Sequence, residues 1–212
     1  SKTKPLVEVI ELNLEDFYCG KTLIINIEKE KTIDSNGKVD NNGFKTCKEC
    51  DGNGIKNIVR RMGPMVQQMQ VQCEKCGAKG FRLKSGYKIE PFREKIEIKI
   101  EKGSPNEHQI VLNGQGNYDY KTKSYGDLVI VLKEKEHKTF QRRGYDLYTS
   151  LDINIIEALS GVETYIKHLD KRELYIRTEE IIENGMVKVV KYEGMPDRKS
   201  TRLNSSHQII SY

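Results

Sequence analysis

Apolar and polar residues alternate over several short stretches of this chain, which is the pattern of half-buried β-strands. The alternation is strict at residues 95–101, and apolar residues also occupy every second position of 10–14 and of 151–155. The second and third stretches each lead into a short helical pattern that ends at a glycine, Gly20 or Gly161. We therefore expect a mainly β protein with low helix content.

The chain also contains an internal repeat. Residues 10–20 resemble residues 151–161, and each segment is followed by a predicted strand, at 22–27 in the first copy and 163–168 in the second. The copies end alike, at residues 112–117 and 191–196, but the first is longer by 63 residues. Four cysteines lie within that excess. The repeat predicts two related β-rich domains, the first of which is interrupted by an insertion.

These patterns give predicted domain boundaries. The first domain should comprise residues 1–29 and 93–138, the insertion residues 30–92, and the second domain residues 139–196. The polar stretch 133–144 is expected to connect the two domains. Residues 198–212 resemble the conceptual translation of sequencing-adapter read-through, so we expect 197–212 to be a non-native tail outside the fold.

Composition narrows the possible functions. Charged residues make up 32% of the 212 residues and give a net charge of +5, but the two signs are interspersed and +2 of that charge comes from the last sixteen residues. We therefore expect no nucleic-acid partner. No apolar run approaches the ~20 residues that span a bilayer, and the first residues lack the apolar stretch of a signal peptide, so we also expect no membrane association.

Four of the five cysteines form two Cys-x-x-Cys pairs, Cys47 with Cys50 and Cys73 with Cys76. Two intervening residues let both thiolates of a pair face one ion, and two pairs complete a tetrahedral site that favours structural zinc. Glycines after each pair permit the tight turns that such a site needs. We predict one zinc ion bound by these four residues, in a reducing compartment. Cys19 is expected to be a spare thiol.

Two other interpretations of the cysteines remain open. The pairs could be redox dithiols, although they occur twice and no βαβ pattern surrounds them. The insertion could instead be a zinc-ribbon nucleic-acid binder, since it carries Lys56, Arg60 and Arg61, although aromatic residues do not interleave these charges. The methionines of residues 60–71, around a predicted Gly63-Pro64 turn, could form a contact surface or fill a thin hairpin.

Features of an enzyme are not found. No catalytic triad, carboxylate pair or phosphate-binding glycine loop stands out in the sequence. The four histidines, His108, His137, His168 and His207, lie in polar surroundings and are expected to be solvated surface residues. We therefore predict a protein that binds rather than catalyses.

Several motifs resemble one family. The Cys-x-x-Cys-x-Gly-x-Gly unit of residues 47–54 is the repeating unit of the DnaJ cysteine-rich domain, and residues 62–68 resemble eukaryotic type I DnaJ proteins. Further matches are the segments 14–18, 126–128, 140–146, 157–161 and 193–196. The resemblance covers residues 4–196 in order, and we identify the chain as similar to the zinc-binding, type I DnaJ co-chaperones.

The resemblance implies two tandem β-sandwich-like client-binding domains, the first interrupted by a reduced zinc-binding β-hairpin module. Such proteins hold unfolded polypeptides and transfer them to a DnaK-type (heat-shock 70) ATP-driven chaperone, here expected in the cytoplasm. A client segment is expected to add as a strand to an apolar groove on the first sandwich. The positions that match this groove are Leu6, Ile25, Ile27, Ile96 and Ile130. These residues could instead simply face the core.

The chain departs from the family pattern in three respects. It carries two cysteine units in place of four, in the positions of the inner pair, so one zinc is expected in place of two. The second unit has Ala78 where the pattern has glycine. No His-Pro-Asp triplet occurs, so the J domain is absent from this chain, and the closing strand and dimerisation helix expected after residue 196 are not recognised. A homodimer is expected only for the full-length protein.

Overall fold

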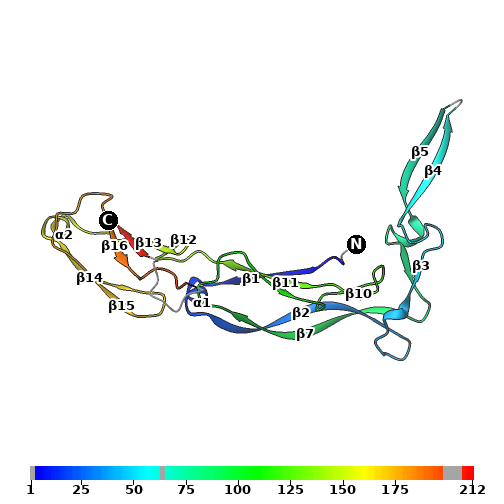
Figure 1. The fold of residues 1–212 in the computed structure, drawn as a ribbon, viewed down its shortest axis with the longest axis horizontal. Helices are drawn as coiled ribbons and strands as arrows, with labels where there is room; N and C mark the ends of the chain where they lie inside the picture. Colours follow the sequence, from blue (N-terminus) through cyan, green and yellow to red (C-terminus); the bar gives the residue numbers. More distant parts are fainter. Residues whose placement is uncertain (1–2, 63–64, 198–206) are drawn as a thin grey trace. The chain divides into compact units, whose positions relative to one another are not determined.

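The computed structural model describes residues 3–62, 65–197 and 207–212 of the chain (Figure 1). These residues are mainly β, with short α-helices α1 (Leu14–Cys19) and α2 (Ile155–Ser160) and the 3-10 helices η1 (Asn41–Gly43) and η2 (Glu74–Cys76). The prediction of a mainly β chain with an inserted cysteine cluster is confirmed. None of the described helices has the length and apolar character needed to cross a bilayer.

Most of the strands are short. In chain order they are β1 (Leu6–Leu12), β2 (Lys21–Ile33), β3 (Phe44–Thr46), β4 (Ile55–Met62), β5 (Met65–Gln72), β6 (Phe81–Leu83), β7 (Lys88–Ile100), β8 (His108–Leu112), β9 (Tyr118–Asp119), β10 (Ser124–Tyr125), β11 (Leu128–Glu134), β12 (Gln141–Arg143), β13 (Asp146–Ser150), β14 (Val162–Lys167), β15 (Glu173–Thr178), β16 (Val187–Lys191) and β17 (His207–Ser211). Strands β2 and β7 are the longest, with 13 residues each.

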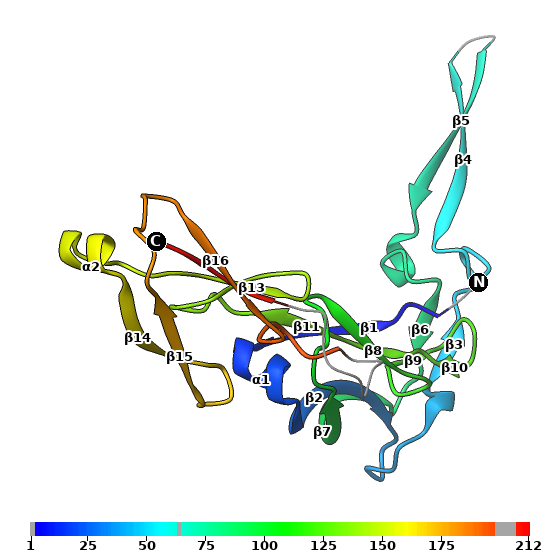
Figure 2. The same cartoon turned by 60° about the vertical axis from the view of Figure 1, so that its left-hand side comes forward.

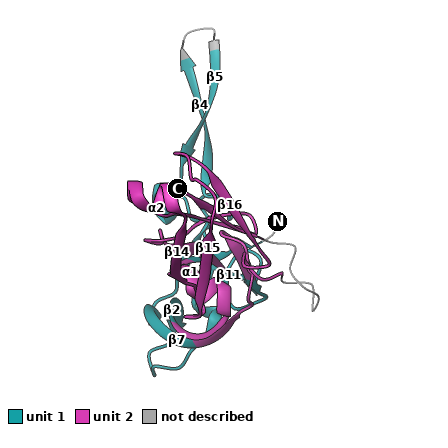
Figure 3. Ribbon diagram, turned by 90° about the vertical axis from the view of Figure 1, so that its left-hand side faces the viewer, with its two compact units in different colours: residues 1–8, 26–95, 111–129 teal, residues 9–25, 96–110, 130–212 magenta. Residues whose placement is uncertain are grey.

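The chain divides into two compact units (Figure 3). The first unit comprises Ser1–Glu8, Asn26–Lys95 and Val111–Val129, and the second comprises Val9–Ile25, Ile96–Ile110 and Ile130–Tyr212. The long strands β1, β2 and β7 therefore contribute residues to both units. The domain boundaries expected from the repeat remain a prediction.

The first unit contains the cysteine insertion. Antiparallel β3 and β6 form its base, with Phe44 opposite Leu83 and Thr46 opposite Phe81. Beyond the cysteines, β4 and β5 pair over eight residues each, as predicted for the strands on either side of Gly63-Pro64, which lie outside the described residues. The hairpin has no buried side in its described residues: Ile58 and Met69 face each other and are both exposed. An isolated two-stranded hairpin is marginally stable, so this one depends on its base.

The second unit contains a four-stranded sheet and a separate β-hairpin. The sheet order is β12-β13-β17-β16, with β13 and β17 parallel, and its core residues include Leu147 and Ile210, both fully buried. In the hairpin, β14 and β15 run antiparallel side by side (Figure 2). Alternate residues of this hairpin are buried, including Val162, Ile166 and Ile176. One side of this hairpin is therefore buried, and β14 lies where a strand was predicted at residues 163–168.

Two expectations for the second copy require correction. The alternating residues 151–155 do not form a strand: the preceding β13 ends at Ser150, and Ile155 already begins α2. Residues 207–211, which we expected outside the fold, form β17 between β13 and β16, with Ile210 and Gln208 fully buried. This sheet therefore has a closing strand. The non-native origin of residues 197–212 stays a prediction.

Candidate metal centre

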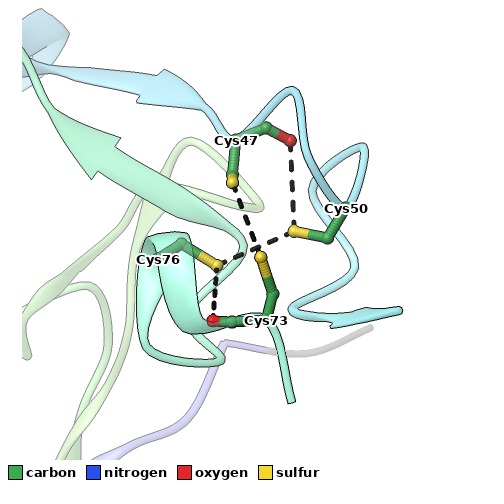
Figure 4. Close-up of side chains that lie close together, drawn as sticks. All are labelled: Cys47, Cys50, Cys73 and Cys76. Carbon is green, nitrogen blue, oxygen red and sulfur yellow. Dashed lines mark hydrogen bonds between the residues drawn. The ribbon is translucent and has the colours of Figure 1, made fainter. Parts of the chain in front are cut away.

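The four paired cysteines come from two turns of the first unit. Cys47 directly follows β3, and Cys50 lies in the turn after it; Cys73 directly follows β5, and Cys76 ends η2. We call residues 47–54 the first knuckle and residues 73–80 the second knuckle. All four side chains point toward one another (Figure 4), and none is more than 8% exposed. Among the described residues, these four form the one cluster able to hold a metal ion.

The geometry of the sulfur atoms fits a tetrahedral ion. The Sγ atoms of Cys47 and Cys73 are 3.9 Å apart, and those of Cys50 and Cys76 are 3.7 Å apart. All four Sγ atoms lie within 4.8 Å of one another. Four thiolates at about 2.3 Å from a zinc ion stand about 3.8 Å apart at the corners of a tetrahedron. The 3.9 and 3.7 Å separations match this value, so the four sulfur atoms are placed to hold a tetrahedral metal ion.

Backbone N–H groups support the sulfur atoms in the same way in both knuckles. The N–H of Gly54 donates to Cys50 Sγ at 3.3 Å, and the N–H of Gly80 donates to Cys76 Sγ at 3.2 Å. The knuckles are also bonded to each other, because Cys47 N–H donates to Gly80 O and Cys73 N–H donates to Gly54 O, at 3.0 and 2.9 Å. The repeated sequence unit thus produces a repeated structure.

The last glycine of each knuckle is required by the other knuckle. A Cβ atom at Gly54 would lie 2.2 Å from the carbonyl oxygen of Ala78, and one at Gly80 would lie 2.2 Å from that of Gly52. No side chain fits at such distances. Ala78, the departure from the family pattern, adopts a positive φ of 62° that glycine tolerates better. Gly52, the equivalent residue of the first knuckle, also has a positive φ, of 83°, so both turns use this conformation, which strains an alanine.

The thiols do not ionise alike in the absence of an ion. Burial raises the pKa of Cys73 to about 11. At Cys76 burial also opposes ionisation, but hydrogen bonds from the Gly80 N–H and from neighbouring thiols to the thiolate lower its pKa to about 7. Four thiolates enclosed together repel one another, so full ionisation requires a cation. The cluster therefore has the chemistry of a closed metal site.

Cys19 takes no part in the cluster. It is exposed at the end of α1, in the second unit, and burial slightly disfavours its thiolate, which raises its pKa. Cys19 therefore lies outside the four-cysteine cluster, and its role as a spare thiol stays a prediction.

The five residues predicted for a client groove lie on four strands. Leu6 is on β1, Ile25 and Ile27 are on β2, Ile96 is on β7 and Ile130 is on β11. Ile27, Ile96 and Ile130 are buried, whereas Leu6 and Ile25 are partly exposed. Leu6 and Ile27 belong to the first unit and the other three to the second. Their role in a groove stays a prediction.

A group of aromatic residues in the first unit was not predicted from the sequence. The ring of Phe44 lies tilted by 38° against that of Tyr120, with 3.7 Å between the ring centroids, and meets Phe81 edge to face at 5.2 Å. Phe44 precedes the first knuckle by three positions and Phe81 directly follows the second. Their placement on either side of the cysteines was the signal available in the sequence.

The prediction that His168 is a solvated surface residue is wrong. Its side chain is buried in the second unit, where Nε2 lies 2.9 Å from the carbonyl oxygen of Glu193, which accepts the hydrogen bond. Tyr18 meets the ring edge to face at 4.9 Å. Nothing in the polar local sequence indicates this burial, because the partners come from distant segments.

Comparison with known proteins gives a consistent result over nearly the whole chain. The family described as the DnaJ C terminal domain matches residues 6–211. "Chaperone protein dnaJ 2" of Arabidopsis thaliana is 32% identical over 204 residues, which cover 90% of this chain and 48% of that protein. "DnaJ homolog subfamily A member 4" of Homo sapiens is 35% identical over 212 residues, covering 93% and 53% respectively. The chain thus spans about half the length of these relatives.

Proposed function

Because this chain belongs to the DnaJ C-terminal domain family, we propose that it is the client-binding region of a co-chaperone. In this role it holds unfolded polypeptides and passes them to a DnaK-type (heat-shock 70) ATP-driven chaperone, without catalysis of its own. The match of the family over residues 6–211 is the observation that carries this proposal. The names of the relatives, which are chaperones and DnaJ homologues, support it.

We further propose that the cysteine cluster binds one zinc ion. The tetrahedral spacing of the four buried sulfur atoms supports this choice, since four thiolates in a closed site favour zinc. The ion would neutralise the thiolates and tie the first knuckle to the second, and so fix the base of the β4–β5 hairpin. With no position left for water, its contribution is structural rather than catalytic.

Metal analysis of the purified chain tests this assignment. We expect one zinc per chain in the wild-type protein and less than a tenth of that in Cys73→Ser, with Cys19→Ser as the matched control that keeps its zinc. Wild-type chain with two zinc ions, or with none after purification in zinc-containing buffer, would contradict the one-site proposal. The same measurement in Cys19→Ser would detect any contribution of the fifth thiol.

Client binding is proposed for the groove positions Leu6, Ile25, Ile27, Ile96 and Ile130. Their aliphatic character and position on strands support this role, because an extended segment adds to a strand edge and places alternate side chains in apolar pockets. Ile25 is the most suitable position to test, since it is only partly exposed while its neighbour Ile24 is 67% exposed.

Ile25→Ser and Ile24→Ser form the matched pair. We expect the wild-type chain to suppress aggregation of a chemically denatured reporter enzyme, and Ile25→Ser to reduce the suppression several-fold while Ile24→Ser leaves it near the wild-type level. Zinc content and thermal midpoint verify that both variants fold. If both variants suppress aggregation equally poorly, the proposed groove is wrong. If the wild-type chain itself does not suppress aggregation, the proposed client-holding function is wrong.

The remaining assignments follow from the same proposal. We place the protein in the cytoplasm, assign it no nucleic-acid or membrane partner, and expect a homodimer only of the full-length protein. The predicted domains, residues 1–29 with 93–138, 30–92 and 139–196, are the proposed functional divisions. A redox role is less well supported, because thiol exchange needs an accessible thiolate and the four thiols are buried. Oligonucleotide binding that weakens with salt would instead support the zinc-ribbon alternative.

A further inference from the structure

A cavity of about 810 Å³ lies in the first unit, beside the base of the cysteine insertion. Its walls come from six separate stretches: residues 3–6 before and at the start of β1, one residue of β2, the first residue of β3, residues 79 and 81 at the start of β6, one residue near the start of β7, and residues 117–120. A volume of this size is in the range of small-molecule binding sites, and more of its lining is apolar than polar. We call it the aromatic pocket.

Aromatic rings form one wall of this pocket. They are Phe44, Phe81, Tyr118 and Tyr120, joined by the Phe44–Tyr120 and Phe44–Phe81 contacts described above and by an edge-to-face contact of Tyr118 with Tyr120 at 5.1 Å. All four are only partly buried. The hydroxyl of Tyr120 is hydrogen-bonded to Thr32 Oγ1, so this residue offers its ring rather than its hydroxyl. A further ring could join the group edge to face.

The charges around the pocket cancel. Lys4 and Lys79 contribute two positive charges to the lining, and Glu30 and Asp119 contribute two negative charges. A cationic side chain would be attracted by the two acidic residues but repelled by the two lysines. An anionic side chain would be attracted by the lysines and repelled by the acidic residues. The rim therefore favours a neutral occupant, and the aromatic wall favours one with a ring.

The pocket lining includes a residue of an outer strand. Leu6, the first residue of β1, lines the pocket, and β1 is an outer strand in the described sheet β1-β11-β8. On its paired side, the N–H of Leu6 donates to the carbonyl oxygen of Asp127 at 2.9 Å. An extended polypeptide that pairs with the other side of β1 would pass the pocket and could insert a side chain.

We propose that the aromatic pocket receives a neutral aromatic side chain from the extended client segment. This inference rests on the proposed client-holding function and adds a selectivity to it. Leu6 belongs both to the predicted groove and to the pocket lining, so one bound segment fills the groove with aliphatic side chains and the pocket with a phenylalanine, tyrosine or tryptophan. The pocket thereby recognises the residues that a folded protein normally buries.

Two peptides of the same apolar sequence, one with a central tryptophan and one with a central leucine, test the inference with the zinc-loaded full chain. We expect the tryptophan peptide to bind about two- to tenfold more tightly, the gain typical of an added aromatic pair. Ile89→Trp should fill the pocket and abolish the preference, because Ile89 lines the pocket and is itself 44% exposed. Tyr118→Ala should abolish it by removing part of the wall. Ile24→Trp, outside the pocket, should keep it.

The outcomes separate this inference from the function on which it rests. Equal affinities of the two peptides for the wild-type chain would overturn the aromatic pocket and leave client holding intact. A preference that survives in both Ile89→Trp and Tyr118→Ala, with zinc content unchanged, would also overturn it. No binding of either peptide would refute the proposed function, and the pocket's role in client selectivity with it.

Discussion

Helices α1 and α2 occupy the same place in the two copies of the repeat, yet only α1 is anchored in a core. Both have six residues, follow an asparagine and end at a glycine with positive φ, Gly20 or Gly161. In α1, Leu14 and Phe17 are 1% and 0% exposed, whereas α2 buries no residue. The position of Phe17 is taken by Ala158 in the second copy.

The difference shows that one local pattern can specify a helix without specifying its burial. Capping residues and the terminal glycine determine where each helix begins and ends, because they act within a few residues. Burial depends instead on a large side chain and on a distant surface to receive it. Phe17 satisfies both conditions: its carbonyl oxygen accepts a 2.7 Å hydrogen bond from Gly103, and the Arg142 guanidinium lies 5.9 Å from its ring.

The largest predicted effect tests this difference directly. Phe17→Ala should lower the free energy of unfolding by about 3–5 kcal/mol, since it leaves a cavity in a fully buried site. Denaturant titration followed by circular dichroism measures the loss. Ile155→Ala, in the exposed helix, is the matched control and should change stability by less than about 0.5 kcal/mol. Similar losses in the two variants would contradict the comparison.

For the terminal glycines, the loss of stability should be larger at α2 than at α1, the reverse of the core substitutions. A Cβ at Gly161 would lie 2.3 Å from Thr178 O, whereas one at Gly20 would lie 3.1 Å from Ile100 O. Both positions also carry the strain of positive φ. We expect Gly161→Ala to cost about 2–3 kcal/mol and Gly20→Ala about 1–2 kcal/mol in the same titration. A larger loss at Gly20 would show that burial of the helix, not the local clash, controls these sites.

The N-terminal cap should matter more at α2, which buries none of its own residues. Asn154 Oδ1 accepts from Glu157 N at 2.9 Å, and Glu157 Oε2 accepts from Asn154 N at 2.8 Å. At α1 the reciprocal bond from Asn13 N to Asp16 Oδ2 is 3.3 Å long. Asn154→Ala should cost about 1 kcal/mol. Asn13→Ala, in the helix that its core residues also secure, should cost less, as judged from thermal midpoints.

The smallest predicted effect on stability concerns the exposed side of α2. Leu159 is 62% exposed, beside Ile155 and Ile156, each 73% exposed. Leu159→Gln should leave the thermal midpoint within the error of measurement and raise the solubility limit of the purified chain, because it divides an apolar patch. A clear drop in the midpoint would reveal a packing role that the exposure of Leu159 does not indicate.

The sequence predicted what local chemistry controls. The spacing of the cysteines located the four-cysteine cluster, the alternation at residues 95–101 located part of β7, and the glycines located the ends of α1 and α2. Each of these depends on residues close together in the chain. The family resemblance then supplied the fold of the whole, which periodicity alone could not.

Features built by distant residues were not predicted. His168 looked solvated because its neighbours are polar, but Tyr18 and Glu193 enclose it. The stretch 151–155 alternates like a strand, but its last residue begins a capped helix. The aromatic pocket was not predicted for the same reason, because its walls come from six segments that only folding brings together.

The contacts of Gly54 and Gly80 carry a consequence for how such a site can change over generations. Each glycine leaves room for a carbonyl of the opposite knuckle, and one ion would need ligands from both. A mutation that disrupts one knuckle therefore also disrupts the carbonyl contact and the shared metal site on which the other knuckle depends. One knuckle alone would not form a metal site that selection could preserve. Lineages should retain or lose the two knuckles together, with the first loss releasing the second from constraint.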